Sequence, residues 1–306
     1  MRTLLRLAVL AGTVSLSAPA LQAQILTLSR EQLVKFTAKN PFGRFPDGRP
    51  KVPDPMLEQA KGLSVEEAWG VLSAAKYDNQ FAGEFRLLHP GKKLAGRAVT
   101  AQFMPRRPDV ADVADLDAQA RGQTKSHNQR VIDLLQPGDV LVVDLFGKID
   151  GGTFVGDNLA AAIFAATKAG FVIDGAVRDL EGIFPLDMAA YFRGVHPASL
   201  ANVMLTGFNI PIRIGTATVM PGDVVLGDRE GVCFIPPHFV EEILQKAEIT
   251  HIHDEWTKKK FLGGSYKSSD LYGAPLDPKL QQEYEDYLRQ KLGAAKYESY
   301  KKDQKK

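Results

Sequence analysis

Two short polar clusters contain the residue types that could carry chemistry. The first is Gly156-Asp157-Asn158 and the second is Arg178-Asp179, with Arg178 lying 21 positions after Asp157. If the first cluster starts a helix, its free backbone N–H groups and the helix dipole favour an anion. A guanidinium beside these groups could hold the same carboxylate-bearing substrate, and Asp179 could hold a divalent metal ion.

A less specific interpretation fits the same residues. Asp157 could be no more than a helix N-cap, whose short acidic side chain accepts hydrogen bonds from free backbone N–H groups. Arg178 and Asp179 could be solvated charges in a surface loop. The spacing of these residues alone does not separate the two interpretations.

The segment 138–182 has the pattern of a strand, a loop, a helix and a second strand. An apolar run at 140–146 predicts the first strand, and a glycine-rich loop follows it. Residues 159–168 have helical apolar spacing, Gly170 is placed to end that helix, and 171–174 predict the second strand. Such units usually form two parallel strands with a right-handed crossover, and ligands collect beyond the carboxyl ends of the strands. Both polar clusters fall at these ends.

The first 23 residues have the features of a secretory signal peptide. Arg2 and Arg6 precede a mostly apolar stretch at 4–16, and small residues at 18–23 offer cleavage sites. We therefore expect export to the periplasm or the extracellular space. An uncleaved anchor helix is the alternative, although the apolar run is short for a membrane span. No later stretch is apolar for long enough to span a bilayer, so no stable membrane insertion is expected after cleavage.

Composition and charge narrow the classes of protein. Contents of 44% hydrophobic and 24% charged residues are those of a globular chain. Loss of Arg2 and Arg6, with no acid in the same segment, lowers the net charge from +2 to 0. The mature chain therefore lacks the overall basic field of a nucleic-acid-binding protein. The single Cys233 predicts a buried structural thiol, and it excludes an intrachain disulfide or a cysteine-based zinc cluster.

The chain divides into four parts in the sequence. These are the signal peptide at 1–23, an N-terminal arm at 24–60, an α/β domain at 61–264 and a C-terminal helical extension at 265–306. The arm is rich in proline, and we expect a short helix at 30–38 followed by extended chain. Arms of this kind often wrap a neighbouring subunit, which the sequence permits.

Further elements are predicted around the central unit. Ser64 and Glu67 match a capping box, which predicts a helix to about residue 75. The other expected elements are a strand at 94–104, a loop at 105–117, a helix at 124–135, strands at 188–192, 210–214, 216–219, 224–226 and 232–235, and a long helix at 238–261.

Several well-known motifs are missing from the sequence. The glycine loop lacks the G-x-G-x-x-G order, and neither a G-x-x-x-x-G-K-[ST] loop nor a G-x-S-x-G elbow occurs. His251 and His253 lie two positions apart, so they point to different sides of a helix. Glu248, His251 and Glu255 have helical spacing, but most such ladders are solvated faces, and the pattern alone leaves the role of Glu255 open.

Residues 96–104 and 138–260 resemble the family that contains class II 4-hydroxy-4-methyl-2-oxoglutarate aldolases and the regulator of ribonuclease activity A. The resemblance is carried by GDVLVVD at 138–144, GDNL at 156–159, VIDGAVRD at 172–179, PGDVV at 221–225 and DREGV at 228–232. It implies a three-layer β/β/α domain of the swivelling type, which usually assembles as a homotrimer or homohexamer. The arm, the segment at 105–122, the tail after 265 and the signal peptide depart from the family.

The resemblance implies a pyruvate-binding site at the start of the helix. Carried over, substrate contacts would come from Gly156, from the backbone N–H groups of Asn158 and Leu159, and from Arg178. Asn158 stands where the family commonly has an apolar residue, which a backbone donor tolerates.

The resemblance also implies a divalent metal, Mg²⁺ or Mn²⁺. Asp179 would be its direct ligand, and Asp157 would bind it through water. A glutamate from the C-terminal helix of a neighbouring subunit would complete the site through water, and Glu255 is the match, with Asp254 as the alternative.

The activity implied is cleavage of a small 2-oxo acid to pyruvate, by an aldolase or by an oxaloacetate decarboxylase, with Arg178, Asp157 and Asp179 as catalytic residues. The metal would stabilise the enolate, Arg178 would orient the pyruvyl group, and a water positioned by Asp157 would act as general base. The alternative from another class is a non-catalytic binding protein of the regulator type.

Overall fold

The computed structural model describes residues 26–124, 126–264, 266–273, 275 and 277–304 of the 306-residue chain. The predicted signal peptide at 1–23 lies outside these residues. Within the described ranges, no helix combines the length and the apolar character needed to cross a membrane.

Helices and strands alternate in the middle of the chain, between β3 and β6, with helices at both ends of the described part. They are α1 (Arg30–Phe36), α2 (Asp54–Ala60), α3 (Val65–Ala74), β1 (Phe81–Ala82), β2 (Arg86–Leu87), β3 (Leu94–Pro105), α4 (Pro108–Ala120), α5 (His127–Ile132), β4 (Asp139–Val155), α6 (Asp157–Thr167), β5 (Gly170–Val177), α7 (Leu180–Ile183), β6 (Ala189–Val195), β7 (Val203–Phe208), β8 (Ile212–Ile214), β9 (Ala217–Val219), β10 (Val224–Gly227), β11 (Val232–Ile235), a 3₁₀ turn (Pro237–Phe239), α8 (Val240–Gly263), α9 (Ser268–Leu271), α10 (Pro278–Leu292) and α11 (Ala294–Asp303).

A single large sheet organises the described part of the chain. Its strand order is β1-β11-β10-β3-β4-β5-β6-β2, and β7 also pairs with β3. The central strands β3, β4, β5 and β6 are parallel, and the strands around them are antiparallel. Helix α6 connects β4 to β5, as the strand–helix–strand pattern predicted. β8 and β9 form a separate hairpin.

Both faces of the large sheet are covered. Because side chains alternate along a strand, Leu141 and Val143 lie in one core cluster while Val140 and Val142 lie in another. The first cluster includes residues of α5 and α6, namely Val131, Ile132, Ala160 and Ile163. The second includes residues of the hairpin, namely Ile212, Ile214, Ala217 and Val219. Helix, sheet and hairpin thus give a mixed α/β fold in β/β/α layers.

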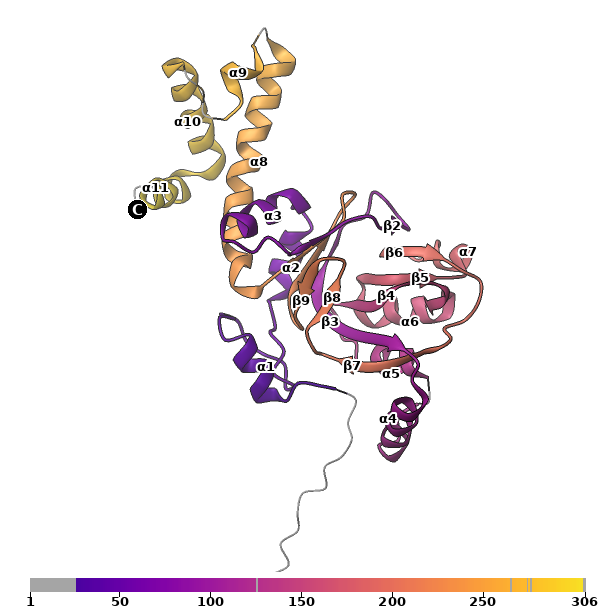
Figure 1. Cartoon of the computed structure of the whole chain (residues 1–306). Helices are drawn as coiled ribbons and strands as arrows, with labels where there is room; N and C mark the ends of the chain where they lie inside the picture. Colours follow the sequence, from indigo (N-terminus) through magenta and orange to yellow (C-terminus); the bar gives the residue numbers. More distant parts are fainter. Residues whose placement is uncertain (1–25, 125, 265, 274, 276, 305–306) are drawn as a thin grey trace, which may run out of the picture.

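The C-terminal helices extend the molecule beyond the sheet. The first part of α8 packs with α2 and α3 against β10 and β11. The rest of α8 runs away from the sheet, and α10 and α11 lie beside it (Figure 1). A small cluster of Ile252, Leu288, Leu292 and Tyr297 joins these helices. The predicted C-terminal helical extension is confirmed.

The N-terminal arm packs against its own domain. The predicted helix at 30–38 is confirmed by α1, whereas α2 was not expected. Leu26 forms two backbone hydrogen bonds across to β7, with its N–H 3.0 Å from Thr206 O and its carbonyl 3.1 Å from Phe208 N. These two bonds add the start of the arm to the edge of β7.

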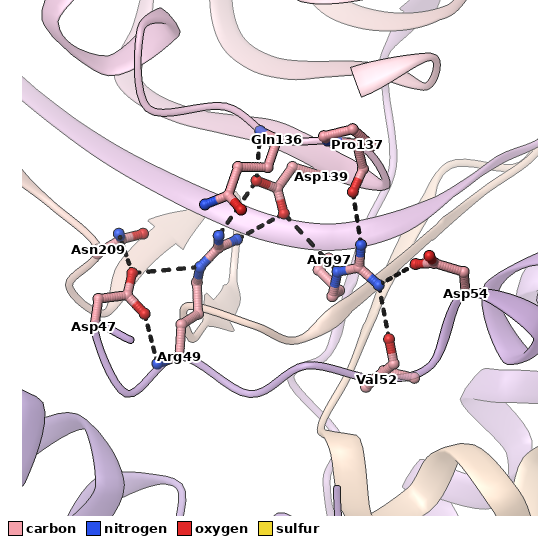
Figure 2. A network of polar contacts seen from close by, with 9 residues as sticks. All are labelled: Asp47, Arg49, Val52, Asp54, Arg97, Gln136, Pro137, Asp139 and Asn209. Carbon is pink, nitrogen blue, oxygen red and sulfur yellow. Dashed lines mark hydrogen bonds and ion pairs between the residues drawn. The ribbon is translucent and has the colours of Figure 1, made fainter. Parts of the chain in front are cut away.

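A buried ionic network fixes the arm to the start of β4 (Figure 2). The Arg49 guanidinium, on the arm, donates to both carboxylate oxygens of Asp139, at 2.8 and 3.3 Å. The residues are only 1% and 0% exposed. Arg97, also 1% exposed, has its Nε 3.9 Å from Asp139 Oδ1. Its terminal nitrogens donate to the Val52 and Pro137 carbonyls and to Asp54, each at 2.7 Å.

The loop predicted at 105–117 is wrong, because Pro108–Ala120 forms helix α4. Proline is favourable at the first position of a helix, where its missing N–H would have no intrahelical partner. Ala111 and Ala118 are buried on one face. Most of the other positions are exposed and four of them are aspartates, which together with Pro105 and Pro108 made the segment look like a loop.

Two details of the central unit also differ from expectation. The glycine-rich segment is not a loop but the bent second half of β4, with positive φ at Phe146, Gly147 and Gly151. Gly170 does not end α6, since Lys168 takes the left-handed conformation there at φ 57°. Gly170 is needed for packing instead, because a Cβ would lie 1.7 Å from the Ala189 carbonyl oxygen on β6.

Strand β7 was missed because its pairing is non-local. Thr206 Oγ1 donates to the Gln102 carbonyl at 3.1 Å, across 104 positions of sequence. The predicted helix at 124–135 is shorter in the structure, where α5 spans His127–Ile132. Cys233 is buried, as predicted, and burial raises the pKa of its thiol to about 12.

Asp223 provides a pH-dependent contribution to stability. It is 2% exposed, and burial raises the pKa of its carboxyl from 3.8 to about 7, against one hydrogen bond from Met220 N–H at 2.8 Å. The folded chain thus retains a proton that the unfolded chain releases. Its stabilising effect is complete below the unfolded pKa and is lost as the pH rises toward 7.

We therefore expect Asp223→Asn to flatten the pH dependence of stability. Between pH 5 and pH 8, the wild type should lose about 2 to 3 kcal/mol relative to the variant, because a pKa difference of one unit corresponds to about 1.4 kcal/mol. Denaturant unfolding at a series of pH values measures this difference. Parallel stability profiles for the two proteins would contradict the assignment.

Candidate active site

The sheet brings the two polar clusters together at the carboxyl ends of β4 and β5. Val155 and Val177, the last residues of these strands, are paired. The Arg178 N–H then donates to the Val155 carbonyl at 3.0 Å. Gly156 follows one strand and Arg178 follows the other, so the clusters meet although 21 positions separate Asp157 from Arg178. The structure shows this proximity, which the parallel-strand pattern predicted.

Gly156 allows the two clusters to approach closely. A Cβ at this position would lie 2.4 Å from Asp179 Oδ2 and 3.0 Å from Arg178 Nε. No larger residue fits without displacing these groups. Gly182 is similarly close to the other acid, since a Cβ there would lie 2.8 Å from Asp157 Oδ2.

The start of α6 presents backbone N–H groups beside this cluster. The first intrahelical bond is donated by Ala160 N–H to the Gly156 carbonyl at 3.0 Å, so the N–H groups of residues 157–159 precede the ladder. Asp157 is the first helical residue rather than the N-cap, which is Gly156. Its Oδ1 accepts from the Asn158 N–H at 2.7 Å. A substrate that takes the Asn158 N–H must therefore displace the Asp157 carboxylate from it.

Arg178 and Asp179 form an open ion pair. Arg178 Nε lies 3.2 Å from Asp179 Oδ2, with side-chain exposures of 37% and 47%. Among the described residues, the terminal nitrogens of Arg178 have no hydrogen-bond partner, and its side chain is accessible to a ligand. Asp179 has φ 57° and ψ 41°. A left-handed conformation costs about 1–3 kcal/mol in a residue with a side chain, and such strain is often found at functional sites.

The donors around Gly156 suit a hard divalent cation with water in its coordination shell. Mg²⁺ usually binds through one or two carboxylates and keeps several waters, and Asp179 and Asp157 supply two carboxylates. The described part of one chain contains no group of three or more histidine, cysteine or acidic residues able to hold a metal. A third histidine, cysteine or carboxylate ligand would therefore come from residues other than the described ones of this chain.

Glu255 is not brought to this cluster within one chain. It lies on the part of α8 that runs away from the sheet, on the opposite side from α7 (Figure 1). Tyr287 Oη donates to it at 2.7 Å and Lys291 Nζ at 2.8 Å, and these hydrogen bonds hold the pKa of the Glu255 carboxyl below its usual value. Asp254 is paired with Lys258 at 3.0 Å. Both acids thus have partners of their own.

His196 is a titratable residue near the site that the sequence analysis did not select. Its N–H donates to the Val177 carbonyl at 3.1 Å, directly beside Arg178. Its Nδ1 accepts from the N–H groups of Gly151 and Ala198, at 3.3 and 3.2 Å, which leaves Nε2 to donate to Asp150 at 3.2 Å. Little in the sequence pointed to it, because the predicted strand ended at residue 192, whereas β6 runs to Val195, directly before His196.

A second polar group lies on the hairpin side of the same strands. Asp144 and Asp174 are paired in register, and each is 6% exposed. Burial, with Asp174 close by, raises the pKa of Asp144. Arg193 Nε donates to Asp174 Oδ1 at 2.6 Å, and this ion pair offsets the negative charge of Asp174. The buried Asp144–Asp174 pair therefore has a structural role that needs no ligand.

Comparison with known sequences places these motifs in one family. The model described as Aldolase/RraA, of the RraA-like family, matches residues 65–234. A Halalkalibacterium halodurans protein with the provisional name 4-hydroxy-4-methyl-2-oxoglutarate aldolase is 35% identical over 119 residues, which cover 39% of this chain and 56% of the relative. The Legionella pneumophila protein DlpA is 29% identical over 179 residues, or 58% of this chain and 27% of the relative. The chain thus spans about half or less of the length of these relatives.

Solved structures show the same fold. Streptomyces coelicolor RraAS2, described as an unusual member of the RNase ES inhibitor RraA protein family, matches with a TM-score of 0.60 and 25% identity, over 68% of this chain and 98% of that one. An uncharacterized Pseudomonas syringae protein matches with a TM-score of 0.57 and 22% identity, over 70% of this chain and 96% of that one. With the family model covering more than half of its length, the chain belongs to the RraA-like family.

Proposed function

We propose that this protein is a divalent-metal-dependent lyase that cleaves a small 2-oxo acid to pyruvate. The substrate would resemble 4-hydroxy-4-methyl-2-oxoglutarate or oxaloacetate. The observation that carries the proposal is the Arg178–Asp179 pair, 3.2 Å apart, beside the free N-terminus of α6. Relatives with the provisional name of 4-hydroxy-4-methyl-2-oxoglutarate aldolase support the reaction class.

The chain's own residues would bind and orient the substrate. The guanidinium of Arg178 matches a carboxylate, to which it can donate two parallel hydrogen bonds. The N–H groups of Asn158 and Leu159 would donate to the same pyruvyl group, with the positive end of the α6 dipole behind them. These contacts fix the substrate so that the breaking C–C bond lies near Asp157 and Asp179.

Proton transfer would use the carboxylate at the start of α6. In an aldol cleavage, the substrate hydroxyl loses its proton, the C–C bond breaks, and its electron pair passes into the pyruvate fragment. Once a substrate displaces it from the Asn158 N–H, the Asp157 carboxylate can hold the water that takes this proton. A Mg²⁺ or Mn²⁺ ion held by Asp179 would supply Lewis-acid stabilisation of the developing negative charge.

The open site favours assembly with a second copy. One chain leaves Arg178 and Asp179 more than a third exposed, whereas closing a site against water strengthens its electrostatic interactions. We propose a homotrimer or hexamer in which an acid from a neighbouring subunit, Glu255 or Asp254, contributes through water. Export to the periplasm or the extracellular space, from the predicted signal peptide, is part of the same proposal.

Pyruvate release tests the proposed activity directly. The purified full chain should release pyruvate from 4-hydroxy-4-methyl-2-oxoglutarate or oxaloacetate, followed by coupled oxidation of NADH with lactate dehydrogenase. EDTA should stop the reaction, and added Mg²⁺ or Mn²⁺ should restore it. Activity that persists in EDTA would contradict the metal requirement.

A non-catalytic binding role is the second candidate. It is favoured by the structural match to RraAS2, whose description names an RNase ES inhibitor family. A wild-type protein that is folded but inactive on a panel of 2-oxo acids, with metal present, would support this candidate over the lyase.

A further inference from the structure

A cavity of about 770 Å³ lies at the amino-terminal edge of the parallel strands. It is lined by the residues that lead into β3, β5 and β6, including Lys93, Ala169 and Asp187. Because the strands are parallel, this edge is opposite to the one that carries Arg178 and Asp179. None of the candidate active-site residues lines the cavity.

The cavity is lined by an excess of positive charge. Four lysines, Lys61, Lys92, Lys93 and Lys168, contribute to its wall, against the single acid Asp187. These lysines come from separate elements: one follows α2, two precede β3 and one ends α6. The fold thus collects them from distant parts of the sequence.

Three of the four lysines have a carboxylate partner, and Lys168 is the exception among the described residues. Lys92 pairs with Asp187, and Lys93 donates to the Leu63 carbonyl at 2.8 Å and to Asp228 at 3.2 Å. Lys61 pairs at 2.7 Å with Glu58, which is 70% exposed and outside the cavity wall.

Lys168 has no acidic partner among the described residues of the chain. Its ammonium lies 5.4 Å from the centroid of the Phe164 ring. A lysine at the end of a helix also offsets the helix dipole, which gives Lys168 alone a structural explanation. The other three lysines are held by their ion pairs instead.

The rim of the cavity adds further cationic and donor groups. Arg229 Nε donates to the Pro90 carbonyl at 3.0 Å, and a Cβ at Gly91, in the wall, would lie 3.9 Å from a terminal nitrogen of Arg229. His89, also in the wall, is held by a contact between its Nε2 and the Leu186 carbonyl at 3.2 Å. The histidine ring packs 4.7 Å from the ring of Phe184.

We propose that this cavity binds a small molecule that carries phosphate groups. Its volume falls within the range of ligand sites, about 300–1,000 Å³. The wall is built by four lysines from separate elements, and a lysine ammonium binds phosphate as a point charge. Arg229, whose Nε donates to the Pro90 carbonyl of the wall, adds a guanidinium beside these lysines. The proposal does not depend on the lyase activity, because the two sites are at opposite edges of the sheet.

Binding of inorganic pyrophosphate to the full chain tests the proposal, by isothermal titration calorimetry in EDTA so that metal ions do not contribute. The variants Lys168→Asn and Lys92→Gln should each weaken binding by roughly tenfold, because a charge-assisted hydrogen bond contributes about 1.5–3 kcal/mol. Asparagine is chosen at position 168 because it tolerates the left-handed backbone better than alanine does.

Two control variants separate this cavity from other anion sites. Lys279→Gln removes an exposed lysine on α10 and should leave pyrophosphate affinity within twofold of the wild type. Arg178→Ala should also leave it within twofold, which shows that pyrophosphate does not bind at the start of α6. Thermal melting checks that each variant is folded.

Three results would overturn the proposal. They are the absence of pyrophosphate binding to the wild type, equal binding to the wild type and to folded Lys168→Asn and Lys92→Gln variants, and loss of binding in Arg178→Ala. Tricarballylate, a tricarboxylate, should bind at least fivefold more weakly than pyrophosphate. Equal affinity for the two anions would contradict the preference for phosphate.

Discussion

Replacement of Arg178 with alanine is expected to lower the rate of pyruvate release by a hundredfold or more. Its guanidinium is the one fixed cation beside both Asp179 and the start of α6 in the described structure, at 3.2 Å from the Asp179 carboxylate. Loss of a group that both orients the substrate and offsets its charge typically costs about 10²–10³ in rate. Coupled measurement of pyruvate release, at saturating and at low substrate, gives kcat and kcat/KM separately.

Two further variants make the Arg178 result specific. Arg178→Lys keeps the charge but loses the planar fork, so it should recover only part of the activity. Arg121→Ala removes another partly exposed arginine, which pairs with Asp117 on α4, and should leave activity unchanged. Because the Arg178–Asp179 pair is exposed, Arg178→Ala should melt close to the wild-type temperature. Unchanged activity in Arg178→Ala would refute the assigned site.

Replacement of Arg49 with methionine is expected to destabilise the fold by about 3–5 kcal/mol. The reason is not the loss of an attractive pair but the charge that remains, since removal of one partner leaves a buried ion uncompensated. Asp139 is 0% exposed and would keep one hydrogen bond, from Gln136 N–H at 3.0 Å, and Arg97 Nε at 3.9 Å (Figure 2). Denaturant unfolding followed by circular dichroism measures the change.

A double variant distinguishes this cause from a simple loss of packing. In Arg49→Met with Asp139→Leu, no buried ion is left unpaired, so much of the lost stability should return. Arg121→Ala, in the partly exposed pair with Asp117, serves as the control and should change stability little. If the double variant is as unstable as the sum of the single ones, the ionic explanation is wrong.

The central unit could be predicted from the sequence because its signals are local. The apolar run of β4, the helical spacing of α6 and the apolar start of β5 lie within about forty residues, and their order requires the carboxyl ends to meet. Arg178 and Asp157 could be selected for the same reason. The close approach of Arg178 and Asp179 to Gly156 could not be predicted, because the spacing of glycines does not say which side chains lie next to them.

Other features depended on contacts that the sequence does not show. Arg49 lies among prolines and charged residues, a composition typical of an exposed linker, yet it is buried against a residue 90 positions away. Helix α4 carries four aspartates among its apolar residues, and only Ala111 and Ala118 of it are buried. The partners of Glu255, Tyr287 and Lys291, belong to a helix whose packing on α8 is a tertiary contact. For Arg49 and Glu255, the deciding contact joins residues that lie far apart in the sequence.

The arm's anchor at Asp139 has a consequence for the order of folding. Arg49 leaves the ribosome 90 residues before the carboxylate that pairs with it, and closing so long a loop carries an entropic cost that must be met before the contact stabilises anything. A lone guanidinium or carboxylate is costly to bury, so neither side can become buried early on its own. We therefore expect the arm to dock only after β3 and β4 have paired.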